Sequence, residues 1–108
     1  MVVFPDKTIY LYNQVIDFRK GIASLTNLIY TSFPEADHFN SLFIFFSRNA
    51  RQVKIIEIEK GNIWLYQNRL DAYRFIFPKA EKNIRITSSQ LSLILKTIEP
   101  LKRPKRSQ

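Results

Sequence analysis

The chain has 108 residues, enough for one domain, and 45% of them are hydrophobic, including nine Phe, five Tyr and one Trp, so a folded core is expected. The absence of Cys excludes disulfides, thiolate catalysis and Cys-based zinc sites, and it is compatible with a reducing cytoplasm, where we expect the protein to reside. Only two Gly are present, which excludes glycine-built nucleotide loops. Seventeen Lys and Arg against nine Asp and Glu give a net charge of +8, and this makes a polyanion the expected partner.

The first part of the chain predicts a strand followed by a helix. Residues Thr8 to Tyr12 are β-branched or aromatic and indicate the strand. We expect the helix over residues 17–32, with Asp17 capping its first turn and the Phe33-Pro34 step ending it. Its apolar stripe, at spacings of four, three and four residues, comprises Phe18, Ile22, Leu25 and Ile29.

The middle of the chain predicts four more strands joined by short turns. Residues Leu42 to Phe46 are apolar at every position, which is typical of a central strand covered on both faces. A plausible hairpin connection, Ser47 to Ala50, leads to the next strand. The remaining strands are expected at Gln52–Ile58, Ile63–Tyr66 and Tyr73–Phe77, the last stopped by Pro78.

A second helix has a clear start near the C-terminus. Thr87 and Gln90 have the spacing of a capping box, and Pro100 ends the helix. Its expected buried stripe comprises Leu91, Ile94, Leu95 and Ile98. The whole pattern predicts an α+β fold: one domain over residues 1–100 with a mainly antiparallel sheet of about five strands and two helices, in the order β-α-β-β-β-β-α. Residues 101–108 are expected to form a flexible basic tail.

Catalytic and metal-binding patterns are weak. His38, the only His, is interpreted as an exposed loop residue. Glu57 and Glu59 share one face of a predicted strand and could meet Asp17 around Mg²⁺, but solvated charge at a strand end is the favoured interpretation. No apolar run approaches the length of a membrane span. We therefore expect a protein without catalytic residues, cofactor, metal, membrane contact or small-molecule substrate.

Basic residues gather in three places along the sequence. Flexible cations gain affinity for DNA by releasing condensed counterions, although a solubilising tail is the alternative for the C-terminal group. Trp64 and Tyr66 lie near the later basic residues and could stack on bases, but burial in the core is the favoured interpretation. The candidate DNA contacts are Arg48, Arg51 and Lys54 at the hairpin, Arg69 and Arg74 at the next connection, and Lys102, Arg103, Lys105 and Arg106 in the tail.

Several blocks of the sequence resemble a known family. Asp17-Phe18-Arg19-Lys20-Gly21 is similar to the Asp-Met-Arg-Lys-Gly signature of the small accessory protein of insertion sequence 66 elements, often called TnpB, which is unrelated to the RNA-guided nuclease of that label. Further similar blocks extend the resemblance over about residues 8–100: Leu42–Phe45, Lys54–Ile56, Arg69–Asp71, Phe75–Pro78, Ile86–Thr87, Gln90–Leu91 and Ile98. The chain departs from the family at Ile58–Asn62, where an aromatic-Asp-Gly-x-Gly turn is usual, at Gln67-Asn68, and at Tyr73 in place of Gly.

The resemblance implies an accessory role in DNA transposition, with the catalytic acids carried by a separate transposase. The leading hypothesis is a protein that binds the DNA backbone and that transposase. Arg19 and Lys20 join the candidate contacts because we expect them at a helix start, which attracts anions. The alternative for these two is helix-surface charge, with Arg19 paired to Asp71. The rival functions are a pure protein–protein adaptor of the transposase, without DNA contact, and a metal-dependent nuclease using Glu57 and Glu59.

Overall fold

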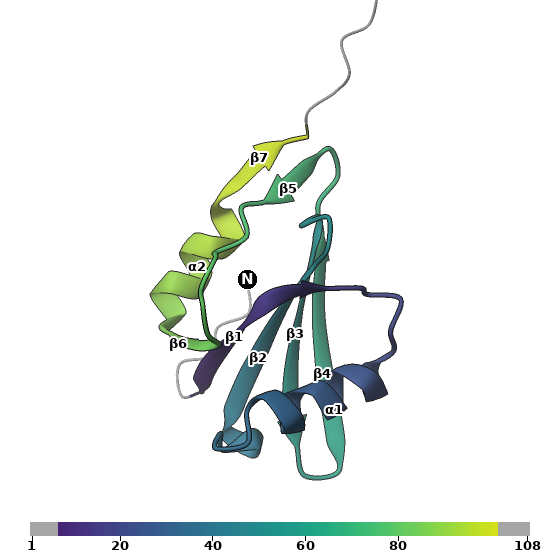
Figure 1. The fold of residues 1–108 in the computed structure, drawn as a ribbon, viewed down its shortest axis with the longest axis vertical. Coiled ribbons are helices and arrows are strands. Elements are labelled where there is room, and N and C mark those ends of the chain that lie inside the picture. Colours follow the sequence, from purple (N-terminus) through teal and green to yellow (C-terminus); the bar gives the residue numbers. More distant parts are fainter. Residues whose placement is uncertain (1–6, 102–108) are drawn as a thin grey trace, which may run out of the picture.

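The computed structural model describes residues 7–101 and shows the expected α+β fold (Figure 1). The tail residues Lys102, Arg103, Lys105 and Arg106 lie outside the described residues. Among residues 7–101, neither helix is long and apolar enough to cross a membrane. In chain order the elements are β1 (Thr8–Ile16), α1 (Ile22–Ser32), a short 3-10 helix η1 (His38–Asn40), β2 (Ser41–Ser47), β3 (Gln52–Glu59), β4 (Asn62–Arg69), β5 (Tyr73–Phe75), β6 (Ile84–Ile86), α2 (Ser88–Lys96) and β7 (Ile98–Pro100).

The main sheet has five strands in the order β4-β3-β2-β1-β6. Its pairs are antiparallel except for β1 and β2, which run parallel with Thr8 opposite Ser41. The parallel pair follows from the connection between the two strands, because α1 carries the chain from the end of β1 back to the start of β2. The β2–β3 and β3–β4 connections are short turns, and these strands form the predicted antiparallel hairpins.

The C-terminal part adds small elements that sequence periodicity did not predict. The strand expected over 73–77 ends at Phe75 and pairs with β7 in a separate two-stranded sheet, in which Tyr73 lies opposite Pro100. The second helix has the predicted capping box but ends at Lys96, so Ile98 belongs to β7. Pro100 disfavours helical geometry only at Glu99, so it does not account for the end at Lys96; residues from Ile98 onward pair with β5 instead. The second added strand, β6, pairs with β1.

The first helix begins later than predicted. Its N-cap is Gly21, and Asp17 is not a helix cap, because the Asp17 carboxylate binds the side chain of Arg19. Residues 17–20 form a turn before the helix, closed by the Lys20 N–H, which donates to the Asp17 carbonyl over 3.2 Å. The expected pairing of Arg19 with Asp71 is therefore wrong, and Arg19 and Lys20 precede the helix. Phe18 lies outside the helix but still packs against the core on the α1 side.

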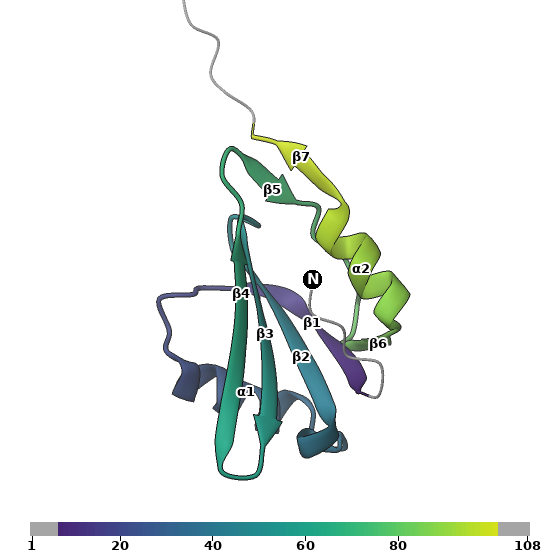
Figure 2. The same ribbon diagram turned by 180° about the vertical axis from the view of Figure 1, so that it is seen from behind.

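Two hydrophobic clusters lie on opposite faces of the sheet and share β2. Every residue of β2 is buried, as predicted for a central strand. One cluster packs under α1, through Leu25, Ile29 and alternate β2 residues such as Phe45. The other packs under α2 and β5, through Leu91, Phe75 and the remaining β2 residues such as Phe46. Below, these faces are called the α1 face and the α2 face. They lie on the two sides of one sheet, which Figures 1 and 2 show from opposite directions.

Candidate nucleic-acid interface

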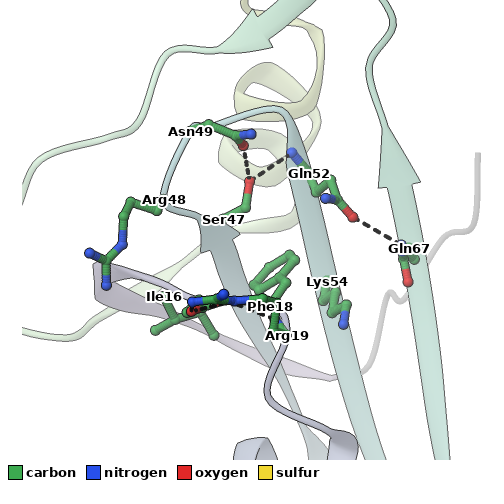
Figure 3. A pocket seen from close by; sticks show the side chains of 10 residues that line it. Ile16, Phe18, Arg19, Ser47, Arg48, Asn49, Gln52, Lys54 and Gln67 are labelled. Atoms are coloured by element: carbon green, nitrogen blue, oxygen red, sulfur yellow. Dashed lines mark hydrogen bonds and ion pairs between the residues drawn. The ribbon is translucent and has the colours of Figure 1, made fainter.

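An open hollow on the α1 face, with a volume of about 820 Å³, brings together three of the predicted basic residues. It lies where β1 and β2 end, next to the turn that precedes α1. Arg19, Arg48 and Lys54 line it. The other lining residues are Ile16, Asp17, Phe18, Ser47, Asn49, Gln52 and Gln67 (Figure 3). The hollow thus combines cationic side chains with amide and hydroxyl groups that can donate hydrogen bonds.

Asp17 is the only acid among the lining residues, and Arg19 neutralises it. Arg19 donates from Nε and Nη2 to the Asp17 Oδ2 over 2.9 and 2.6 Å, a two-pronged geometry that favours the ionised carboxylate. The pKa of Asp17 is held well below its usual range, mainly by the side-chain hydrogen bond from Arg19 and also by the Arg19 backbone, with a smaller electrostatic contribution from Arg48. The same contact raises the pKa of Arg19. Most of the Arg19 side chain, 90%, remains exposed.

The turn between β2 and β3 holds Arg48 at the rim of the hollow. Ser47 Oγ donates to Asn49 Oδ1 over 2.8 Å and accepts from the Gln52 backbone N–H over 3.0 Å (Figure 3). The Arg48 N–H donates to the Ile16 carbonyl over 3.0 Å and fixes the turn to the end of β1. The backbone of Arg48 is therefore anchored on both sides, while its side chain stays exposed to solvent.

Lys54 lies on the floor of the hollow, and Arg69 extends the same face. The Lys54 Nζ is 4.6 Å from the centroid of the Phe18 ring, a cation–π distance. Gln67 is the cross-strand partner of Lys54, and its amide donates to the Gln52 side chain over 3.2 Å. Arg69 is the cross-strand partner of Gln52, so its side chain belongs to the same face. Lys20 and Arg69 do not line the hollow, but Lys20 follows Arg19 in the same turn. We refer to Arg19, Lys20, Arg48, Lys54 and Arg69 as the basic cluster.

Two other predicted contacts take part in internal interactions instead. Arg51 is partly buried and donates from Nη2 to the Leu70 carbonyl over 3.3 Å, a hydrogen bond that holds the connection after β4 against the β2–β3 turn. Arg74 binds Glu99 with an N–O distance of 2.6 Å and joins β5 to β7. Arg51 was grouped with Arg48 and Lys54, and Arg74 with Arg69, because they are close in the sequence; their internal partners set them apart from the basic cluster.

The aromatic pair of β4 lies on the α2 face, opposite the basic cluster. The rings of Trp64 and Tyr66 stack at 6.5 Å between centroids. Trp64 is 50% exposed, so the expectation that it is a core residue is wrong. Tyr66 is partly buried against the α2-side core and donates from its hydroxyl to Glu57 over 2.9 Å. Because the pair and the cations belong to opposite faces, they do not form one base-stacking site.

The carboxylates considered for metal chemistry are not brought together. Glu57 is buried and binds Lys7 as well as Tyr66, whereas Asp17 lies on the α1 face. Within the described part of the chain, no three His, Asp or Glu side chains are grouped closely enough to hold a metal ion. His38 is not freely exposed as expected: its Nε2 lies 2.8 Å from the Phe33 carbonyl, and its ring packs at 4.5 Å from Tyr30.

Sequence reasoning missed the polar residues that complete the hollow. Asn49, Gln52 and Gln67 carry no charge and match no motif, and only the register between β3 and β4 places the two glutamines side by side. Phe18 was expected inside the helix, and its contact with Lys54 depends on the turn that precedes Gly21. The one available signal was the alternation of polar residues 52, 54, 67 and 69, which assigns all four to one face once the hairpin is paired.

Comparison with known proteins gives one family. Searches of curated proteins and of solved structures found no match. A family model described as IS66 Orf2 like protein matches residues 7–105, which is nearly the whole chain. The resemblance carried by the Asp-Phe-Arg-Lys-Gly block is thereby confirmed, and that block forms the turn that supplies Asp17 and Arg19 to the hollow. The chain belongs to the IS66 Orf2-like family, whose members are accessory proteins of insertion-sequence transposition.

Proposed function

We propose that this protein supports transposition by binding the phosphate backbone of DNA through the basic cluster, while a separate transposase performs the chemistry. The observation that carries the proposal is the convergence of Arg19, Arg48 and Lys54 on one open hollow with polar walls. Phosphate oxygens accept hydrogen bonds from Arg, Lys and side-chain amides, and such contacts position a protein on DNA without reading its sequence. The proposal places this contact in the cytoplasm and includes the transposase of the same element as a second partner.

The charge state of the hollow supports this assignment. Its single acid is already bound by Arg19, and no ion pair within residues 7–101 involves Lys20, Arg48, Lys54 or Arg69. Beside the Asp17–Arg19 pair, an approaching phosphate therefore meets cations that form no ion pair with a carboxylate of residues 7–101. Arg51 and Arg74, with their internal partners, contribute to the general positive potential and are not direct contacts in this proposal. The Lys and Arg residues of segment 102–108 add to the same potential.

A salt titration with matched variants tests the proposal. Fluorescence anisotropy with labelled duplex DNA would compare the wild type with Arg48→Gln and Lys54→Gln, and with Lys60→Gln, an exposed cation in the β3–β4 turn, as control. Each lost phosphate contact lowers the slope of log affinity against log salt by about 0.9. We expect this decrease for Arg48→Gln and Lys54→Gln and a smaller or no decrease for Lys60→Gln. Equal slopes in all four proteins would contradict the proposed contact.

The adaptor alternative predicts a different result in a second measurement. If the basic cluster binds an acidic surface of the transposase and not DNA, tagged protein should retain the transposase after nuclease treatment, and Arg48→Gln should release it. If DNA is the direct ligand, the wild type binds duplex DNA without transposase, and Arg48→Gln weakens that binding. Transposase retention lost in Arg48→Gln without any DNA binding by the wild type would replace the present proposal with the adaptor.

A further inference from the structure

Within residues 7–101, β4 is the long edge of the sheet and has β3 as its only partner strand. It pairs with β3 over eight consecutive residues, from Gln52 opposite Arg69 to Glu59 opposite Asn62, without a bulge. On its other side no strand of the described residues adjoins it in the sheet order, and Figure 2 shows none drawn beside it. An edge strand of this kind presents unpaired backbone N–H and C=O groups that can pair with another strand.

The side chains of β4 are unusually apolar for an exposed edge. All of its residues are exposed except the partly buried Tyr66, and the exposed fractions of Ile63, Trp64 and Leu65 are 40, 50 and 39%. Proteins normally protect an edge with a bulge, a proline, charged side chains or a very short strand. The opposite edge, β6, is short, with three residues. By contrast, β4 has no proline and its only charge is Arg69 at its end.

We propose that β4 pairs antiparallel with β4 of a second copy of this chain, about a two-fold axis at Leu65. In this register the uncharged stretch from Asn62 to Asn68 overlaps completely with its symmetry mate. Leu65 lies opposite Leu65 of the other copy on the α1 face, and Trp64 lies opposite Tyr66 of the other copy on the α2 face. Cross-strand aromatic pairs of this kind stabilise antiparallel sheets. The resulting dimer has one continuous sheet.

The charges of the edge favour a second copy in this orientation. Residues Asn62 to Asn68 are uncharged, so the overlapping strands bring no like charges together. Arg69 lies four residues from the axis, so the two Arg69 Cα atoms are separated by about 27 Å along the strands. Each Arg69 instead lies opposite Gly61 in the other copy's β3–β4 turn, where the flanking Glu59 and Lys60 carry opposite charges. A parallel arrangement would place the two Arg69 side chains beside each other.

The dimer would also unite two basic clusters on one surface. A two-fold axis between identical antiparallel edges is perpendicular to the sheet, so both α1 faces lie on the same side. Lys54 pairs with Gln67, two residues from the axis. From strand spacing and rise, the two Lys54 Cα atoms would be about 20 Å apart. The dimer itself does not depend on DNA binding, and it can be tested without nucleic acid.

A charge-pair experiment at the axis tests both the dimer and its register. Sedimentation equilibrium of the full chain over a wide concentration range should show dimers for the wild type. Leu65→Lys alone and Leu65→Glu alone each place two like charges at the axis, which should weaken dimerisation by at least about 100-fold. An equimolar mixture of the two variants places Lys opposite Glu, and we expect dimers to reappear.

The control variant is Leu93→Lys, which adds the same charge at another exposed leucine, on α2. We expect Leu93→Lys to dimerise like the wild type, with circular dichroism confirming that all variants are folded. Three outcomes would overturn the proposal: a wild type that is monomeric at every concentration, dimers that persist in both Leu65→Lys and Leu65→Glu, or dimers lost in Leu93→Lys. Failure of the mixture to dimerise would likewise refute an axis at Leu65.

Discussion

At the scale of single residues, the Asp17–Arg19 contact determines how much positive charge the hollow presents. Arg19 lowers the pKa of Asp17, so the carboxylate stays ionised well below pH 4. We predict that Arg19→Gln raises the pKa of Asp17 toward its ordinary value of about 3.9. Because the pKa of Asp17 is lower in the folded protein than in the unfolded chain, the Asp17–Arg19 pair stabilises the fold fully at pH values above the unfolded pKa. This stabilisation is lost as the pH falls through the lower pKa that Asp17 has in the folded protein.

Carboxyl ¹³C shifts in an NMR titration would measure this change directly. Lys20→Gln, which removes a neighbouring charge but no hydrogen bond to Asp17, serves as the control. An unchanged Asp17 midpoint in Arg19→Gln would show that the contact is absent in solution.

The buried carboxylate of Glu57 gives a second residue-scale prediction. Tyr66 donates a hydrogen bond to it, and burial followed by this contact raises the pKa of the Tyr66 phenol. We expect Tyr66→Phe to lower the free energy of unfolding by about 1–2 kcal/mol, because Glu57 loses a partner. Because the pKa of Tyr66 is higher in the folded protein, this stabilisation is complete at pH values below about 10, the pKa of tyrosine in the unfolded chain. It is lost as the pH rises through the higher pKa that Tyr66 has in the folded protein.

Urea denaturation at pH 7 and pH 11 would check both parts of that prediction. Tyr73→Phe, at a more exposed tyrosine on β5, should change stability by less than about 0.5 kcal/mol. If Tyr66→Phe were as stable as Tyr73→Phe, the hydrogen bond to Glu57 would contribute nothing.

At the scale of secondary-structure elements, the capping box is the feature that fixes the start of α2. Thr87 accepts from the Gln90 backbone N–H over 3.0 Å, and the Gln90 side chain accepts from the Thr87 N–H over 2.8 Å. Thr87→Ala should therefore lower the free energy of unfolding by about 1 kcal/mol, whereas Thr87→Ser keeps the hydroxyl and should be nearly neutral. Chemical denaturation compares the three proteins. Equal losses in both variants would mean that the hydroxyl is not what matters at this position.

Elements with a strong local signal could be predicted from the sequence, and elements defined by their partners could not. The apolar run of β2 and the box at Thr87 are local, and both were predicted correctly. The strands β6 and β7 have three residues each, and they exist because β1 and β5 offer edges to pair with. The start of α1 was missed because Asp17 suits a helix cap equally well, and only the observed contact with Arg19 shows its actual partner.

The candidate site shows the same division. Charge and motif pointed to Arg19, Arg48 and Lys54, and the structure places these three around one hollow. Sequence alone could not separate them from Arg51 and Arg74, because it does not show which cations have an internal partner, here the Leu70 carbonyl and Glu99. Nor could it show that Trp64 lies on the far side of the sheet at an edge, since strand order and register decide this.

At the scale of the whole molecule, both cores depend on the same strand. Phe45 and Phe46 are neighbours on β2, yet Phe45 belongs to the α1-side core and Phe46 to the α2-side core. Loss of either core exposes one side of β2, so the other core cannot persist alone. Unfolding should therefore be a single cooperative transition in spite of the two separate clusters.

Two substitutions, one in each core, test this coupling. Leu25→Ala and Leu91→Ala should each lower the free energy of unfolding by about 2–5 kcal/mol, because both side chains are almost fully buried. Urea titrations would follow Trp64 fluorescence, which reports on the sheet edge, and far-ultraviolet circular dichroism, which reports on both helices. We expect the two signals to coincide in the wild type and in both variants. If Leu91→Ala shifted the dichroism transition and left the Trp64 transition in place, α2 would unfold independently, and the two faces would be separate folding units.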